Sequence, residues 1–420
     1  MEGSIETIAT NNLLLIFSMI IITGIALGRI SEILKIPDVI LYLIAGIIIG
    51  PAFFNILSIG AFPVENNLIL TFGSAFILYE GGKEINLKVL NKVKVSVGML
   101  STVGVVISTA VVGVVVAMIF NLPIMTAFLL GAVIASTDPA ALIPVFKQVR
   151  IKDKIKQTVV SESAFNDAVG AILSSALLGI VMSGQFSAME SFKELLISAA
   201  VGIGVGILVG YLLIILVSDK RVGIFHSYAP IMSMLTVTLA YELATMFHGS
   251  GYMAVFMAGL ISGNKKMFGI WLEEADYQPT VHFTESIATI CRMSIFVLLG
   301  TQVNISALAQ YWLPSLITVL ALMFVGRPLV VLVSTVFDRK AQWTFKDKLF
   351  MMWVRETGVI PAAVSGIIVA MKVPSYEIIS SVVFMTILVT LIVQASTTKL
   401  VAKKLGVLEE TTSNVSEVVA

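Results

Sequence analysis

Two short polar runs lie inside stretches of the chain that are otherwise strongly apolar. Residues 136–139 form the first run and residues 161–167 the second, so that Asp138, Glu162 and Asp167 fall within thirty residues of one another. At the centre of a bilayer a charged side chain costs at least about 3 kcal/mol on insertion scales, and acids found there mark ion or proton pathways. These three carboxylates are therefore candidates for binding a cation or a proton.

The polar residues of the second run share one face of a helix. Glu162 and Asn166 are four residues apart, as are Ser163 and Asp167, and this spacing brings side chains together on a helix surface. Carboxylate, amide and hydroxyl oxygens with nearby carbonyls suit a hard cation such as Na⁺, Li⁺ or K⁺ rather than zinc or copper. A carboxylate shielded from water can hold either a proton or a cation, and that competition is sufficient for exchange. The alternative for Asp167 is a structural ion pair with an arginine inside the membrane.

The first run also interrupts the helix that must position it. Asp is a favoured N-cap and Pro is tolerated in the first helical turn, so Asp138-Pro139 predicts a helix start in mid-span and two half-helices within 123–145. A second break is expected where Gly358 precedes Pro361. Two such interrupted spans in corresponding positions of two halves indicate an inverted-repeat secondary transporter with a site near the midplane. The alternative is a pair of kinks tolerated for packing.

The chain as a whole is strongly apolar. Of its residues, 57% are hydrophobic and only 13% are charged. That excludes the soluble globular class, and a single cysteine, Cys291, leaves neither a disulfide framework nor a Cys/His metal cluster. About 20 apolar residues make one crossing. Counted in this way, the chain has thirteen segments, centred near residues 22, 48, 75, 107, 134, 170, 206, 237, 257, 290, 323, 358 and 387.

The basic residues alternate between the loops on the two sides of these segments. Of the 27 Lys and Arg residues, twenty-two fall on one side, two on the other and three within spans. The positive-inside rule then places the N-terminus outside and the C-terminus in the cytoplasm. We expect one transmembrane domain over residues 1–420, all-α and polytopic, whose residues 405–420 form a short cytoplasmic tail. The first apolar run is too long for a signal peptide and is read as a retained span.

The remaining charges inside or near the spans need partners. Arg292, Arg327 and Arg355 lie within spans, and a buried arginine is tolerated only when it is paired. Glu162 is a natural partner for one of them. Glu80, near the cytoplasmic end of the third span, either is a surface acid at a helix end or lines the ion path.

Several of these motifs are shared with one family of transporters. They are Gly28-Arg29 through Pro37 to Tyr42-Leu43, Gly46, Gly50-Pro51, Leu78-Tyr79-Glu80-Gly81-Gly82, Thr137-Asp138-Pro139-Ala140, Ser161 through Asp167, and Gly326-Arg327-Pro328. In these motifs the chain resembles the monovalent cation/proton antiporters, and within them the NhaP-type sodium/proton exchangers. The resemblance extends over most of the chain, and the Thr-Asp-Pro and Phe-Asn-Asp runs at this spacing are highly specific.

The resemblance implies an overall architecture. A core bundle, including about residues 123–182 and 312–371, would hold two crossed discontinuous helices at spans 5 and 12. This core would move against a dimerisation bundle to carry ions across, and the protein would be a homodimer.

The resemblance also implies roles for individual residues. Asp167 would be the principal carboxylate for cation and proton, with Asp138, the Ser163 hydroxyl and the Thr137 carbonyl completing the cation site. Asn166 would orient that site.

The same resemblance implies roles for Glu80 and Glu162, and it assigns a further meaning to Asn166. Glu80 would line the cytoplasmic approach, and Glu162 would pair with Arg327 or Arg355. Asn166 in front of the essential aspartate is similar to the electroneutral branch of the family, which exchanges one proton for one cation.

One motif departs from the family pattern. NhaP-type chains usually have Arg-Gly before Val-Pro-Ala, whereas here Thr357 precedes Gly358 and the arginine is Arg355. On a regular helix a shift of two residues is about 200° around the axis. Arg355 can therefore take the usual position only if the chain is unwound there, which leaves the partner of Glu162 and the cation selectivity open.

The function predicted from the sequence is exchange of Na⁺ or Li⁺ for H⁺ across a prokaryotic plasma membrane, and K⁺/H⁺ exchange by the same mechanism is the nearest alternative. A passive cation channel would want a filter loop or ring, which the sequence lacks. An organic-anion symporter would need uncompensated positive groups at the break. The two acids there, Asp138 and Asp167, disfavour that function. We expect no enzymatic activity, no cofactor and no nucleic-acid partner; the lipid bilayer, the cations and a second copy of the chain are the expected partners.

Overall fold

The computed structural model describes residues 2–34, 37–57, 63–138, 151–185, 188–217, 223–270 and 274–408. Throughout these ranges the chain is helical, and its one β contact is an isolated antiparallel bridge between Ile151 and Leu408. The predicted all-α class is therefore confirmed. Residues 139–150, which include Pro139 and the second half of the first interrupted span, lie outside the described residues.

The helices follow one another through short connections. In chain order they are α1 (Glu2–Leu34), α2 (Asp38–Ile49), α3 (Pro63–Glu84), α4 (Leu87–Ser101), α5 (Val103–Phe120), α6 (Ile124–Val133), α8 (Asp153–Ser183), α9 (Ala188–Val217), η3 (His226–Tyr228), α10 (Ala229–Met246), α11 (Gly251–Gly263), η4 (Lys265–Phe268), α12 (Glu274–Thr301), α13 (Ile305–Ala321), the π-helical η5 (Leu322–Gly326), α14 (Arg327–Val336), α15 (Phe345–Trp353), α16 (Val359–Ala370), α17 (Tyr376–Val389), the π-helical η6 (Thr390–Ala395) and α18 (Ser396–Leu405).

These helices match the apolar segments seen in the sequence. Of the thirteen predicted centres, all but two fall within a helix, and the two exceptions, Ile134 and Gly358, lie in the stretches where breaks are expected. By length and composition, eight described helices or helix pairs could cross a membrane: 14–34, 87–120, 153–183, 193–217, 226–246, 278–301, 305–336 and 376–405. Shorter apolar helices cover 38–49, 124–133, 251–263 and 359–370.

Large apolar side chains cover much of the outer surface. Ile22 on α1 is 68% exposed and Met118 on α5 is 77% exposed. A soluble monomer rarely exposes broad apolar surface of this kind, whereas helices that face lipid must do so. The chain is therefore a multi-pass membrane protein.

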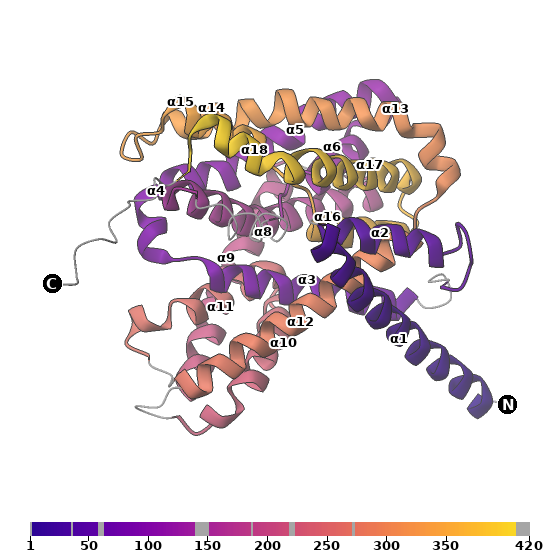
Figure 1. Ribbon diagram of the computed structural model, residues 1–420, viewed down its shortest axis with the longest axis horizontal. Coiled ribbons are helices and arrows are strands. Elements are labelled where there is room, and N and C mark those ends of the chain that lie inside the picture. Colours follow the sequence, from indigo (N-terminus) through magenta and orange to yellow (C-terminus); the bar gives the residue numbers. More distant parts are fainter. Residues whose placement is uncertain are drawn as a thin grey trace.

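Two helices occupy the middle of the molecule. In Figure 1, α13, α14, α17 and α18 lie along one margin and α9 to α12 along the other, with α8 and α16 between them. Helix α8 contacts α4, α6 and α11, and α16 contacts α3, α12 and α17. Both predicted polar motifs therefore lie on or beside central helices, away from the margins.

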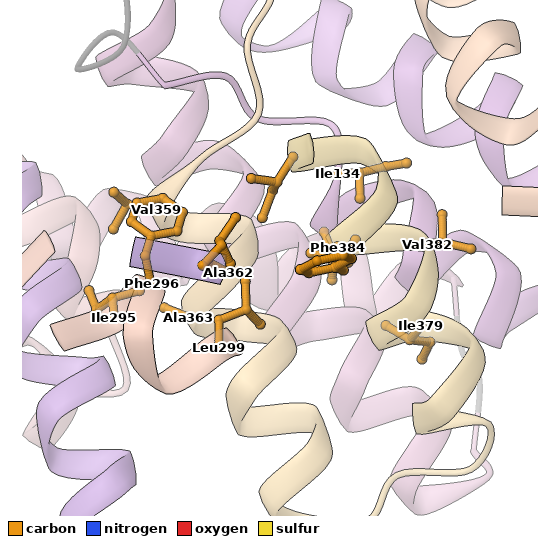
Figure 2. Close-up of a cluster of buried hydrophobic side chains, with 14 of the residues drawn as sticks. Ile134, Ile295, Phe296, Leu299, Val359, Ala362, Ala363, Ile379, Val382 and Phe384 are labelled. Carbon is orange, nitrogen blue, oxygen red and sulfur yellow. The ribbon is translucent and has the colours of Figure 1, made fainter. Parts of the chain in front are cut away.

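A buried apolar cluster holds α16 in place. Figure 2 shows Phe296 of α12, Val359 and Ala362 of α16 and Phe384 of α17 in one buried cluster with Ile134, which follows the end of α6. Lipid tails are as apolar as these side chains, so close van der Waals packing rather than exclusion of water stabilises such contacts in a membrane. The cluster thus fixes the end of α6 and the start of α16 relative to each other.

Both breaks are present where the described residues allow a test. Helix α6 ends at Val133, and residues 136–138 have no regular structure. Residues 354–358 are likewise not helical, and α16 begins at Val359, two residues before Pro361. The backbone is therefore unwound on both sides of the predicted site.

Candidate functional site

The stripe of polar residues on α8 is buried. Glu162, Ser163, Asn166 and Asp167 are all at most 5% exposed, although a 31-residue helix in this position could have turned one face to water or lipid. The i, i+3 and i, i+4 spacing places them on the side that faces the end of α6. The predicted convergence of these side chains is therefore present.

Thr137 ties the first polar run to this stripe. Its backbone N–H donates to Oδ1 of Asn166 over 3.0 Å, and the Asn166 amide donates back to the Thr137 hydroxyl over 2.9 Å. The Ser163 hydroxyl donates to the Thr137 carbonyl over 2.6 Å. The N–H, the hydroxyl and the carbonyl of Thr137 are thus all held by two side chains of α8.

Asp138 joins the first break to the second. Its backbone N–H donates to the carbonyl of Glu356 over 2.8 Å, and its Oδ2 accepts a hydrogen bond of 3.2 Å from the N–H of Val359. Val359 is the first residue of α16, so the carboxylate lies at the positive end of that helix dipole. The two unwound stretches are therefore in direct contact through Asp138.

Gly358 makes that contact possible. An ideal Cβ built at this position would lie 2.5 Å from Cγ of Asp138 and closer still to its Cβ and Oδ2. Real Cβ atoms do not approach other atoms so closely. Any larger residue must therefore displace the carboxylate or the start of α16.

Asp167 is one of the described acids with a buried carboxylate oxygen that makes no hydrogen bond. In the part of the chain that the structure describes, its buried Oδ1 and the hydroxyl of the nearby Ser136 have no hydrogen-bond partner. Asp138 faces the same carboxylate. Buried polar atoms are nearly always hydrogen-bonded, so an orphaned carboxylate oxygen beside a second acid and a hydroxyl marks a place for a proton or a cation.

Asp138 and Ser136 place a second carboxylate and a hydroxyl beside Asp167. The described residues contain no cluster of three or more His, Cys, Asp or Glu side chains that could hold a metal ion. Two carboxylates, hydroxyls and the Thr137 carbonyl instead provide oxygen alone, which suits a hard, weakly bound cation.

Arg327 is the arginine that pairs with Glu162. Its two terminal nitrogens each donate to one carboxylate oxygen of Glu162, with the second distance 3.0 Å. The same guanidinium donates to the carbonyls of Met351 and Val354 over 2.8 and 3.2 Å. Both partners of the ion pair are buried, and the pair connects α8, α14 and the end of α15.

Arg355 has a different set of contacts. It donates to the carbonyls of Ile134 and Ala135 over 2.6 and 2.9 Å and to the hydroxyl of Thr357 over 3.3 Å. Ile134 and Ala135 directly follow α6, so the guanidinium lies at the negative end of that helix. Arg355 can make these contacts because residues 354–358 are unwound.

Glu80 lies in a separate polar group between α3 and α12. Lys83 donates to both of its carboxylate oxygens, over 3.1 and 2.9 Å, and to the hydroxyl of Thr284 over 2.7 Å. Thr284 in turn donates to Glu80 over 3.3 Å. The structure therefore pairs Glu80 with Lys83 rather than placing it among the hydrogen bonds that surround Thr137 and Asp138.

Two residues of the site were not assigned a role from the sequence. Ser136 belongs to the first polar run and faces Asp167, but a single serine beside a break gives no signal of its own. Glu356 was visible as a charged residue in the second break, and its carbonyl anchors Asp138. Its carboxyl lies beside the hydroxyl of Thr398 on α18, a helix that the sequence gives no reason to place there.

Comparison with known proteins adds the family. Residues 17–404 match the family model described as the transmembrane sodium/hydrogen exchanger. The chain belongs to that family. The exchanger is 33% identical over 413 residues to Na⁺/H⁺ antiporter 1 of Methanocaldococcus jannaschii, a match that covers 92% of this chain and 94% of the relative. It is also 28% identical to the K⁺/H⁺ antiporter NhaP of Alkalimonas amylolytica, covering 92% of this chain and 65% of that protein.

The fold of the exchanger agrees with this assignment. The solved structure of the sodium proton antiporter MjNhaP1 from Methanocaldococcus jannaschii at pH 8 superimposes with a TM-score of 0.82 and 29% sequence identity. The superposition covers 94% of this chain and 99% of the other. The resemblance to the NhaP-type branch is therefore confirmed.

The buried ion pair predicts a large stability difference. Glu162→Gln leaves Arg327 charged and uncompensated, and loss of one partner of a buried pair costs about 3–5 kcal/mol. We expect the variant to unfold at a clearly lower temperature in detergent, as followed by intrinsic fluorescence. Glu32→Gln is the matched control, because its pair with Arg29 is more than two-thirds exposed and such pairs contribute little. Equal melting of the two variants would contradict the structural role of Glu162.

Gly358 predicts a functional effect. Gly358→Ala must displace Asp138 from the start of α16, and displacements of this size commonly reduce activity by roughly tenfold or more. We expect cation-driven proton flux in proteoliposomes to fall accordingly while the protein remains folded. Gly179→Ala on α8, where a Cβ meets no atom within 4 Å, is expected to retain full flux. Unchanged flux in Gly358→Ala would show that the position of Asp138 is not critical.

Proposed function

We propose that the protein exchanges Na⁺ or Li⁺ for H⁺ across the plasma membrane, with the two ions competing for Asp167. The observation that carries this proposal is the orphaned, buried oxygen of Asp167 beside Asp138 and Ser136. An unpaired carboxylate in a dry interior is costly by several kcal/mol. The site is therefore stable when it holds a proton or a cation and unstable when it holds neither.

This instability provides the coupling. An empty, ionised Asp167 cannot be buried during a change of access without a large energetic cost. The protein changes access only when the carboxylate is neutralised, by one proton or by one cation. Exchange follows without a direct contact between the two ions.

In the proposed site Asp167 is the exchangeable ligand, and Asp138, the Ser163 hydroxyl and the Thr137 carbonyl complete the coordination. The Thr137 carbonyl already accepts from Ser163, and a carbonyl oxygen has a second lone pair for a cation. Asn166 orients the site, because it holds both the N–H and the hydroxyl of Thr137.

Four charged residues support the site rather than bind the cation. Glu162 and Arg327 hold α8 against α14. Arg355 compensates the partial negative charge of the carbonyls at the end of α6. Glu80 lines the cytoplasmic approach, where release from Lys83 exposes a carboxylate to an incoming ion.

For the architecture we propose thirteen spans with the N-terminus outside and residues 405–420 in the cytoplasm. Spans 5 and 12 are crossed discontinuous helices of two inverted repeats, and the contacts of Asp138 and Arg355 between the two breaks support this arrangement. The core bundle includes residues 123–182 and 312–371, and a dimerisation bundle completes a homodimer.

The nearest alternative is K⁺/H⁺ exchange at the same site. A relative named as a K⁺/H⁺ antiporter shares 28% identity, and an all-oxygen site accepts either cation when its size permits. We favour Na⁺ because the relative with 33% identity is named as a Na⁺/H⁺ antiporter. Asn166 before Asp167 favours electroneutral exchange of one proton for one cation, which net current in proteoliposomes tests directly.

Removal of the carboxylate tests the site. Asp167→Asn cannot be neutralised by a proton or a cation in the same way, so cation-driven proton flux in proteoliposomes is expected to disappear. Asp153→Asn is the matched control, because Asp153 lies on the same helix but is exposed at its first turn. Full exchange by Asp167→Asn would refute the assignment of the carrier.

The pH dependence of binding tests the competition. Because proton and cation need the same carboxylate, the apparent Na⁺ affinity of purified protein weakens by about tenfold per pH unit once the site is mostly protonated. Calorimetric titration at several pH values measures this slope. An affinity that does not change with pH would exclude competition at one carboxylate.

A further inference from the structure

The segment 337–348 leads from the end of α14 into the first turn of α15 and is rich in basic residues. Three of these are exposed, namely Arg339, Lys340 and Lys346. A fourth, Lys348, is half-buried. The two acids of the segment, Asp338 and Asp347, are only 6% and 2% exposed. The surface of this segment is therefore positively charged and shows no acid of its own.

Both acids of the segment are engaged inside the protein. Asp338 accepts hydrogen bonds from the N–H and the hydroxyl of Ser96 on α4, over 3.1 and 2.8 Å. Asp347 accepts a hydrogen bond of 3.1 Å from the N–H of Thr344 and pairs with Lys152 over 3.6 Å. Because both carboxylates are buried, the exposed cations of the segment remain available to an anion from outside.

The segment is also held in a fixed shape. Nε1 of Trp343 donates to the hydroxyl of Ser96 over 2.8 Å, and the ammonium of Lys154 on α8 lies 4.1 Å from the centroid of the Trp343 ring. The same ammonium donates to the carbonyl of Ala341. A ligand that binds here does not have to order the backbone, which lowers the entropic cost of binding.

Two large aromatic side chains flank the basic residues at the end of a membrane span. Phe337 directly follows the apolar helix pair 305–336 and is 65% exposed, and Phe345 is 68% exposed. On α14 the exposed apolar surface continues as far as Val336, which is 62% exposed. The basic residues thus begin where the lipid-facing surface ends, and phospholipid headgroups lie at that level.

These features fit an anionic phospholipid surface better than a soluble anion. A cluster of four or more Lys and Arg residues directly beyond a membrane span is attracted to anionic headgroups, and each charge strengthens the attraction by about fivefold. The rings of Phe337 and Phe345 can also bury apolar area at the boundary between headgroups and acyl chains. A soluble polyanion offers no such apolar boundary.

We propose that residues 337–348 form a docking surface for the headgroups of anionic phospholipids in the cytoplasmic leaflet. The surface lies between α14 and α15, at the opposite margin of the molecule from α9 to α12 (Figure 1). It uses none of the residues around Asp167, so lipid binding goes beyond ion exchange and does not depend on which cation is carried. Only the choice of leaflet rests on the proposed orientation of the chain.

Native mass spectrometry of the purified full chain in detergent, titrated with phosphatidylglycerol or phosphatidylcholine, tests this surface. Wild type is expected to bind phosphatidylglycerol in clear preference to phosphatidylcholine. Lys340→Gln/Lys346→Gln removes two exposed charges and is expected to weaken the affinity for phosphatidylglycerol by at least about tenfold. Equal affinity of wild type for the two lipids, or an unchanged affinity of the variant for phosphatidylglycerol, overturns the proposal.

Two further double variants serve as controls. Lys193→Gln/Lys266→Gln removes the same number of exposed charges from the margin of α9 to α12 and is expected to bind phosphatidylglycerol as wild type does. An equal loss in both glutamine variants means that only net charge matters, and it overturns a local surface. Lys340→Arg/Lys346→Arg keeps both charges and is expected to keep the preference for phosphatidylglycerol. All of these positions are exposed, so the melting temperature is expected to stay close to that of wild type.

Ionic strength and free phosphate test the nature of the occupant. Attraction between exposed charges is screened by salt, so the preference for phosphatidylglycerol is expected to shrink as choline chloride is added. A preference that does not change with salt overturns the electrostatic basis of the surface. Displacement of phosphatidylglycerol by millimolar inorganic phosphate overturns a phospholipid as the occupant, because the phosphate group alone would then account for binding.

Discussion

Asp138 holds together two stretches of backbone that have left their helices inside a membrane protein. A bilayer interior has no water for exposed N–H and C=O groups, so unwound chain survives there only where other protein groups satisfy it. The Asp138 N–H uses the carbonyl of Glu356, and the Asp138 carboxylate takes the first N–H of α16. Arg355 donates to two carbonyls at the end of α6, and the hydroxyl of Thr390 accepts from the N–H of Thr357. Each break is stable because the other is present.

The charges near the breaks fall into two groups with different constraints. The terminal nitrogens of Arg327 and Arg355 donate hydrogen bonds to one carboxylate and to several carbonyls. These contacts hold α6, α8 and α14 to the unwound stretches. Asp167 receives no such compensation at its Oδ1. The described structure thus pairs the charges that hold helices together, whereas the carboxylate proposed to bind the exchangeable ion keeps an oxygen without a hydrogen bond. A buried ion pair and the proposed ion-binding acid can therefore lie on one stripe of α8.

The departure from the usual Arg-Gly sequence has a physical consequence. Because residues 354–358 are not helical, Arg355 is not held at the angular position that a helix would impose, and it reaches the end of α6. Arg327, and not Arg355, therefore forms the ion pair with Glu162. The neighbouring Glu356 is buried, and its carboxyl faces both Arg327 and Asp138.

Much of this protein could be predicted from the sequence, because a bilayer limits the possible structures to helices and makes every buried charge conspicuous. The helical segments, both breaks and the stripe from Glu162 to Asp167 follow from apolar length, from Gly and Pro, and from the helical repeat. The partner of Glu162 could not be predicted, since Arg327 and Arg355 are both far from it in the chain and equally suited by type. The tertiary structure decided that question by unwinding residues 354–358. It also placed Ser136 against Asp167 and Glu356 near α18, because contacts between distant helices depend on how those helices pack and not on the spacing of residues along any one of them.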